Sequence, residues 1–452
     1  MSHKRVLSTM LLSWSCFCLM SIQWPLFTYS LSFGPGTSLL GGLGFGLFDS
    51  ADRLRANATI PEHAFCAFQM AFAIVTAAVV SGSVAGRVTL GAWSLFCFLW
   101  HLLAYVPLAR WVFYPGGWLA QMGVLDFAGG LVVETNSGVS GLVLAALVGW
   151  QERRLLEKKR DGGSGGEHEE GLLLSLHHHH PTPGSGAPAH QHGAAHAPPP
   201  HSVPLILLGS GLLHFGWLGF NAGSAITSGY EASRAFLNTH LAGASGILGW
   251  AAAEVLFSGL PAAPSQQHSP LSLAFYRGLG KGRPTAVGAA TGVVVGLCAI
   301  TPACGFISPM ASLGLGFVAA FISYGMERIV HRVFGVWDTL NAFSGHGVAG
   351  MVGTLAVGLF ASVGEGAPAN GAVFGGAAPC GSGIAACGWG LLGVQALGVG
   401  VAVCVAAAGT LVSWGCVCGV FAGMGWGSPL LAVSDAGAEE AWSLDAPAIN
   451  SD

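Results

Sequence analysis

About ten stretches of this chain are long and apolar enough to cross a lipid bilayer. A membrane span needs roughly 20 mostly apolar residues. Asp, Glu, Lys and Arg make up only 8% of the 452 residues, whereas a soluble domain carries about 25%. A soluble fold with so few charges would lack a polar surface, so we predict an all-α polytopic membrane protein. The expected spans are residues 6–30, 62–83, 90–107, 122–150, 203–228, 235–256, 285–302, 307–325, 338–361 and 388–423.

Lys and Arg are distributed unevenly between the loops that alternate along these spans. One set of loops carries all of them except Arg53, Arg55, Arg110 and Arg234. Basic residues accumulate on the cytoplasmic side of membrane proteins. The basic set is therefore assigned to the cytoplasm, and both ends of the chain fall on that side.

Two segments fall outside the predicted membrane core. Residues 151–202 are charged and then rich in Gly, Pro and His, a composition typical of a disordered cytoplasmic loop. Residues 425–452 form a short acidic tail. The remaining chain divides into a first half of four helices, residues 1–150, and a second half with the final helix, residues 203–424.

Composition also argues against several classes of function. A formal net charge of -4 disfavours a nucleic-acid partner. The 11 cysteines lie mostly in apolar stretches without a CxxC pair, so we interpret them as core thiols and expect no zinc or redox framework. Cys380 and Cys387 share a polar loop, where a disulfide is an alternative. No nucleophile–base constellation indicates an enzyme, and we expect no cofactor and no metal site.

One polar spacing occurs twice in the predicted spans. Asp126 is followed eight residues later by Glu134, and Asp338 is followed eight residues later by His346. Glycines stand four and seven residues after each second group, on the same helix face: Gly138, Gly141, Gly350 and Gly353. At 1.5 Å per residue, each second group should lie about 12 Å below its Asp, near mid-membrane. Because the two copies cross in opposite directions, they indicate an inverted repeat with a central transport pore between the halves.

Glu134 and His346 are expensive at this depth, so a functional role is the default interpretation and each is the expected partner of the other. The alternative is a protonated Glu134 bonded to Ser or Thr at a helix contact. For Asp126 and Asp338 we favour helix capping through downstream N–H groups such as those of Gly129 or Leu340. A share of Asp126 in cation binding is kept open.

Several residue groups around this repeat resemble the motifs of the Amt/Mep/Rh ammonium transporters, and the Amt/Mep branch more than the Rh gas channels. Residues 125–133 (LDFAGGLVV) are similar to the motif before the first pore histidine, and residues 343–350 (FSGHGVAG) to the motif around the second. Further matches are residues 219–225 (GFNAGSA), 238–239 (NT) and 301–305 (TPACG). The similarity runs from His3 to about Gly423, apart from the His-rich loop.

The resemblance implies a homotrimer in the lipid bilayer with one pore per subunit, and we expect the plasma membrane. It implies ammonium and its analogue methylammonium as substrates. By motif position, Phe72 and Phe220 are similar to the family's two stacked gate phenylalanines. Phe113 and Ser224 correspond to the outer vestibule, where Asp126 is a further candidate.

General physics gives the reason for such a vestibule. An ammonium ion that enters hydrocarbon without water pays heavily. Aromatic faces and a hydroxyl replace part of its hydration. Deprotonation then yields neutral ammonia, which crosses an apolar pore at low cost past the paired pore groups, here Glu134 and His346.

The chain departs from the family pattern in several places. Most members have His where this chain has Glu134, although some fungal members also carry Glu. Phe113 replaces the usual Trp, which should weaken cation recruitment unless Trp111 substitutes. The family has eleven helices, and residues 2–8 resemble the link after its first helix. We therefore expect either a gene start upstream of Met1, which we favour, or a ten-helix variant.

Two rival functions stay open. Nine histidines between His168 and His201 indicate a divalent-metal (zinc) transporter, although no pair of metal-ligand type is evident within the spans. A sensor that binds ammonium with little flux is the second rival.

Overall fold

The computed structural model describes residues 3–46, 60–161, 202–257, 282–375, 387–426 and 428–430. Within these ranges the chain is helical and forms no β-sheet beyond isolated bridges. The α-helices are α1 His3–Gln23, α2 Tyr29–Phe33, α3 Glu62–Ser83, α4 Leu90–Trp100, α5 Val106–Phe113, α6 Trp118–Gln121, α7 Asn136–Asp161, α9 Val203–Gly223, α10 Tyr230–Phe257, α12 Ala286–Ile300, α13 Pro309–Arg332, α14 Ala349–Phe360 and α15 Trp389–Met424. Wider π-helical turns are η1 Trp24–Thr28, η3 His101–Tyr105, η4 Gly130–Thr135 and η5 Phe343–Val348, and η6 Val363–Glu365 is a 3₁₀ turn.

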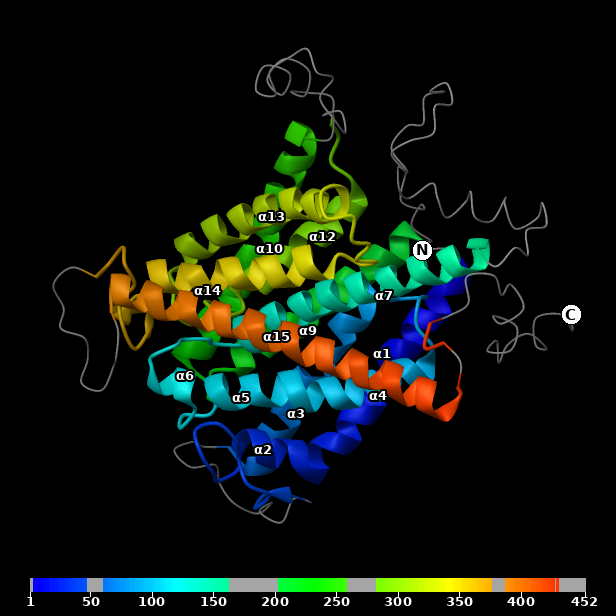
Figure 1. Ribbon diagram of the computed structural model, residues 1–452. Helices are drawn as coiled ribbons and strands as arrows, with labels where there is room; N and C mark the ends of the chain where they lie inside the picture. Colours follow the sequence, from blue (N-terminus) through cyan, green and yellow to red (C-terminus); the bar gives the residue numbers. More distant parts are fainter. Residues whose placement is uncertain are drawn as a thin grey trace, which may run out of the picture.

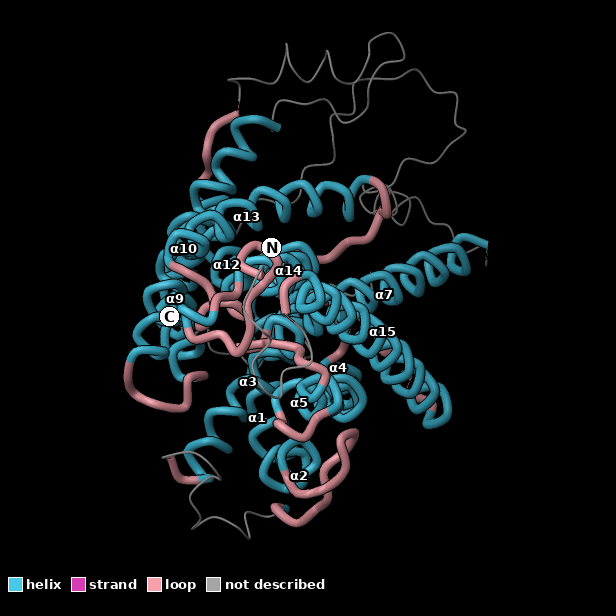
Figure 2. Tube along the Cα trace, turned by 90° about the vertical axis from the view of Figure 1, so that its left-hand side faces the viewer, coloured by secondary structure: helices cyan, strands magenta, loops and turns pink. Residues whose placement is uncertain are grey.

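The described helices form one bundle of membrane-spanning length. Nine described segments are long and apolar enough to cross a bilayer, and α12 is a shorter apolar helix where the sequence predicts a further span. The long helices lie side by side, and the start of α1 and the ends of α7 and α15 lie at the same end of the bundle (Figure 1). Figure 2 shows the same bundle turned by 90°. The prediction of an all-α polytopic membrane protein is confirmed.

Two spans continue through proline by means of wide turns. Pro25 lies inside η1, and Pro107 is the second residue of α5, which directly follows η3. Proline has no N–H to donate and crowds the preceding turn, and local π-type adjustment is one way in which membrane helices accommodate it. The expected end of a span at Pro107 is therefore wrong, because the apolar helical segment runs from Leu90 to Gln121.

The expected loop and tail differ in part from the structure. Helix α7 continues to Asp161, so the first part of the expected disordered loop 151–202 is helical, and residues 162–201 lie outside the described residues. Within the tail, the N–H of Thr89 donates to the carbonyl of Pro429 at 3.0 Å. Cys387 is disulfide-bonded, whereas Cys380, its suggested partner, lies outside the described residues.

Buried apolar side chains gather in two clusters. One is built mainly from α1, α3, α4 and α5, and the other mainly from α9, α10, α12, α13 and α14. Helix α15 contributes to both and runs along α14, α7 and α4 (Figure 1). The two halves of the chain thus pack around separate cores, and the final helix bridges them.

The two copies of the sequence repeat cross each other between these cores. A Cβ on Gly138 would lie 2.2 Å from the backbone nitrogen of Gly347, and one on Gly350 would lie 2.5 Å from the Cβ of Glu134. Real Cβ atoms do not approach so closely, so only glycine fits at either position. Each half therefore supplies a bare backbone surface to the pore turn of the other half.

Candidate functional site

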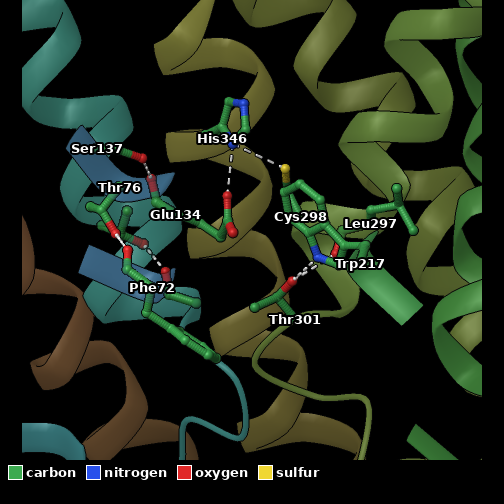
Figure 3. A network of polar contacts seen from close by, with 11 residues as sticks. Phe72, Thr76, Glu134, Ser137, Trp217, Leu297, Cys298, Thr301 and His346 are labelled. Carbon is green, nitrogen blue, oxygen red and sulfur yellow. Dashed lines mark hydrogen bonds and ion pairs between the residues drawn. The ribbon is translucent and has the colours of Figure 1, made fainter. Parts of the chain in front are cut away.

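Glu134 and His346 meet at this crossing. Oε2 of Glu134 and Nδ1 of His346 share a hydrogen bond at 2.8 Å, and Figure 3 shows the two side chains pointing toward each other. The Glu134 side chain is fully buried, whereas 16% of the His346 side chain is exposed. The other carboxylate oxygen, Oε1, has no hydrogen-bond partner. The contact that the repeat predicts is therefore present, and one buried acceptor is left over.

The wide turns η4 and η5 carry these two side chains. Glu134 lies in η4 and His346 in η5, and each turn passes directly into a long α-helix, α7 or α14. π-Helical turns are rare and occur often at functional sites. Glu134 and His346 thus occupy the same kind of backbone at the same point of their repeat.

Asp126 and Asp338 cap these turns from outside the helices. Asp126 accepts hydrogen bonds from the N–H groups of four successive residues, Gly129 to Val132, at 2.6–3.4 Å. Oδ2 of Asp338 accepts from the N–H of Phe343 at 2.8 Å, rather than from that of Leu340. Burial raises the pKa of both carboxyl groups, and the backbone hydrogen bonds oppose that shift.

Capping is thus the observed contact of both aspartates. Their expected place within the spans is wrong, because the helical turns begin only at Gly130 and Phe343. The helical rise of about 12 Å from each Asp to its pore group therefore does not apply. The sequence pattern identified the cap and the Glu134–His346 contact but placed each Asp and its partner group on one continuous helix.

Cys298, near the end of α12, completes the contacts of the pair. Its Sγ lies 3.2 Å from Nδ1 of His346, and one ligand atom from each of Glu134, Cys298 and His346 lies within 4.8 Å of the other two. Sequence reasoning treated this cysteine as a core thiol. A lone Cys in an apolar stretch, 48 residues from His346, gives no signal of such a contact.

Phe72 and Phe220 stack face to face beside the pair. Their ring centroids lie 4.0 Å apart with planes 21° from parallel, and Phe72 lies below Glu134 in the view of Figure 3. Phe113 meets Phe72 edge-on at 6.0 Å. The structure thus brings together three aromatic residues that the motifs single out.

Trp217 connects this stack to the histidine and was missed from sequence. Its ring centroid lies 5.5 Å from that of Phe220 and 6.3 Å from that of His346. Its indole N–H donates to Oγ1 of Thr301 at 2.8 Å (Figure 3). This bond fixes the ring between the two groups, and no sequence motif distinguished this Trp from its 13 counterparts.

Ser224 and Trp111 make separate contacts. Ser224 is the C-cap of α9, and its hydroxyl donates to the carbonyl of Phe220 at 3.1 Å. Trp111, the suggested substitute for an aromatic at Phe113, packs on Trp118 at 5.7 Å.

Comparison with known proteins agrees with this arrangement. The family model described as Ammonium Transporter Family matches residues 1–167, 186–272 and 265–424. An ammonium transporter of Bacillus subtilis (strain 168) is 38% identical over 365 residues, which are 79% of this chain and 73% of that protein. Ammonium transporter 1 of Dictyostelium discoideum is 33% identical over 378 residues, 82% of this chain and 68% of that protein.

A solved structure shows the same fold. The crystal structure of Candida albicans Mep2 superimposes with a TM-score of 0.66 at 26% identity and covers 94% of this chain and 83% of that chain. The family match extends over most of the sequence. With the polytopic helical fold, it establishes that this chain belongs to the ammonium transporter family.

Proposed function

We propose that the chain moves ammonium across a membrane by recruiting the ion at an aromatic vestibule, deprotonating it and conducting ammonia past the Glu134–His346 pair. The observation that carries this proposal is the 2.8 Å bond between these two side chains beside the stacked rings of Phe72 and Phe220. Family membership supports ammonium as the substrate.

The vestibule recruits the cation. Phe113 offers a ring face, the Ser224 hydroxyl accepts a hydrogen bond from the ion, and Asp126 adds a nearby carboxyl group. A ring attracts a cation that lies over its face, and these groups replace part of the hydration shell of ammonium. The Ser224 hydroxyl donates its hydrogen to the carbonyl of Phe220. The hydroxyl oxygen therefore keeps its lone pairs free to accept a hydrogen bond from the substrate.

The stacked rings then act as the gate. Phe72 and Phe220 are in van der Waals contact, so a passing molecule must displace at least one ring. A charged ion would lose its remaining water here at high cost, whereas neutral ammonia would not. The gate thus favours passage after the proton has left.

The pore pair holds a proton of its own on the conduction path. A carboxylate beside an imidazole favours the charged form of each, while burial opposes both charges. The pair is therefore either Glu⁻–His⁺ or a neutral pair, and both states hold one mobile proton.

Family membership supports a proposal for assembly and location. We propose a homotrimer with one pore in each subunit, in the plasma membrane, with the basic loops in the cytoplasm. The shared end of α1, α7 and α15 (Figure 1) is the cytoplasmic end in this arrangement.

The test is uptake of labelled methylammonium in cells that lack their own ammonium transporters. Expression of this chain should restore uptake, and excess ammonium should compete with it. Substrate binding to the purified protein without uptake would favour the sensor. Uptake of zinc in place of methylammonium would favour the metal transporter.

A further inference from the structure

Glu134 and Cys298 share a single hydrogen-bonding atom, Nδ1 of His346. Nδ1 of His346 lies within hydrogen-bonding distance of both Oε2 of Glu134 and Sγ of Cys298, at 2.8 Å and 3.2 Å. A ring nitrogen either donates one hydrogen or accepts one. It therefore satisfies only one of its two neighbours at a time.

A second observation points to a missing partner. Oε1 of Glu134 is buried and has no hydrogen-bond partner, although the Glu134 side chain is 0% exposed. Buried polar atoms are almost always hydrogen-bonded, and an exception calls for an explanation such as an ion. The carboxylate thus has free acceptor capacity beside a thiol and an imidazole.

We propose that Glu134, Cys298 and His346 form a three-ligand site for a thiophilic divalent cation of the Zn²⁺ class, and that the bound ion blocks the pore. Carboxylate, thiolate and imidazole are the three kinds of side chain that bind zinc, and three protein ligands with water in the fourth position form a common zinc site. Their ligand atoms already lie within 4.8 Å of one another. Zinc bond lengths require neighbouring ligand atoms about 3.3–3.6 Å apart, so the two contacts of Nδ1, at 2.8 Å and 3.2 Å, need to open by a fraction of an ångström, and the carboxylate and the thiol need to settle at a similar separation from within 4.8 Å.

Charge balance favours occupation of this buried site. Without metal, the three groups carry two protons that metal can displace, one on the Cys298 thiol and one shared by Glu134 and His346, and their net charge is zero. Binding of Zn²⁺ releases both protons, because the ligands must be thiolate, carboxylate and neutral imidazole. The occupied site is again neutral, so the metal adds no net charge to a dry interior.

One side of the site is open to an ion. His346 is the only partly exposed member of the three, and a Cβ on its neighbour Gly345 would meet no atom within 4 Å. An ion bound at Nδ1 would also displace the proton that the pair holds, and it would do so beside the Phe72–Phe220 gate. The same three residues thus explain both binding and block.

The first experiment measures binding directly and does not depend on transport. Full-length protein in detergent is titrated with Co²⁺, whose bond to a thiolate gives a near-ultraviolet charge-transfer band. The nine histidines between His168 and His201 also bind divalent metal but give no such band, so the band reports only thiolate ligation, and the titration is carried out at buffered free-metal concentrations. The matched control is Cys304→Ala, because Cys304 is also buried but its Sγ contacts the carbonyl of Thr301.

We expect the band in the wild type and in Cys304→Ala, its displacement by Zn²⁺, and its loss in Cys298→Ala. Competition with a chromophoric zinc chelator, which does not depend on the band, should show at least about 100-fold weaker Zn²⁺ binding at this site in Cys298→Ala, since even outer-shell partners of a metal contribute 10–100-fold. Glu134→Gln, which keeps the side-chain shape, should also weaken binding. Absence of the band from the wild type, or an equal band in Cys298→Ala, overturns the site.

The second experiment measures methylammonium uptake with added Zn²⁺, each variant relative to its own zinc-free rate, and only this arm rests on the proposed function. Zinc should inhibit the wild type and Cys304→Ala at concentrations at least about 100-fold below those needed for Cys298→Ala. Equal zinc sensitivity in Cys298→Ala, despite its lost binding, rejects pore block and leaves the metal site standing.

Discussion

In the first half of the chain, Asp126 holds a turn that presents a fully buried Glu134, and in the second half Asp338 holds a turn that presents a partly exposed His346. The backbone parts of the two copies match: an aspartate cap, a π-helical turn and a glycine four residues after the pore group. The ionisable side chain differs, and so does the number of N–H groups that donate to the aspartate, four to Asp126 and one to Asp338. The comparison teaches that backbone contacts keep the two halves alike, while the tip of the pore side chain can vary between them.

The largest effect is expected from removal of the second half's pore group. His346→Ala leaves the Glu134 carboxyl buried without the imidazole that it bonds, at a cost of about 1–3 kcal/mol. Methylammonium uptake should fall by at least about tenfold, which corresponds to about 1.4 kcal/mol. His240→Ala is the matched control, because His240 is exposed on α10. Normal uptake by His346→Ala at normal expression would remove the pore pair from the mechanism.

Substitution of the crossing glycine in either half should lower the stability of the protein. Gly350→Ala places a Cβ 2.5 Å from that of Glu134, and Gly138→Ala places one 2.2 Å from the nitrogen of Gly347. Overpacking of this kind costs about 1–3 kcal/mol, so both variants should have lower unfolding midpoints in detergent. Gly393→Ala is the control, because its Cβ would meet no atom within 4 Å. Equal stability of all three variants contradicts the reciprocal contact.

The gate also takes one side chain from each half, and its loss should have a smaller effect. Phe220→Ala and Phe72→Ala each remove one face of the stack, and Ser224→Ala removes the hydroxyl beside it. Each variant should reduce methylammonium uptake several-fold while its amount in the membrane stays normal. Phe215→Ala is the control, since Phe215 is 79% exposed. Wild-type uptake by both Phe220→Ala and Ser224→Ala refutes the vestibule assignment.

These comparisons also show what the sequence predicts well. The eight-residue spacing after each Asp and the glycines that follow it identified the caps, the crossing and the Glu134–His346 contact. The caps need a carboxylate that accepts from backbone N–H groups, and the crossing needs glycine, so the residue types themselves indicate both. The end of a span at Pro107 was wrong, because a proline in sequence does not show whether the preceding turn widens. The role of Asp126 as a cap was clear, but its position before the helix was not.

Contacts between distant residues were beyond sequence reasoning. Cys298 and Trp217 meet His346 only because α12, α9 and η5 pack together, and neither residue stands in a polar pattern. The helical extension to Asp161 was missed because charged residues exclude burial but not helix. Contacts within one motif could therefore be predicted from the sequence, whereas the contacts of Cys298 and Trp217 with His346 could be found only from the packed structure.

The smallest expected effect tests the one side chain that makes the halves different. Glu134→His gives both halves an imidazole. A Glu–His pair spans net charges from -1 to +1, whereas two imidazoles span 0 to +2, so acid should load the variant with positive charge that repels ammonium. The substitution should leave the η4 turn and the close approach of Gly350 to the Cβ of residue 134 unchanged. Transport should therefore persist near neutral pH, and uptake should fall more steeply than in the wild type as the pH decreases.

The measurement is methylammonium uptake from pH 5 to 8, with Glu157→His as the control for an added histidine on the exposed part of α7. Superimposable pH profiles of wild type and Glu134→His would falsify proton handling at this position. A profile shifted equally by Glu157→His would assign the effect to the added charge rather than to the pore.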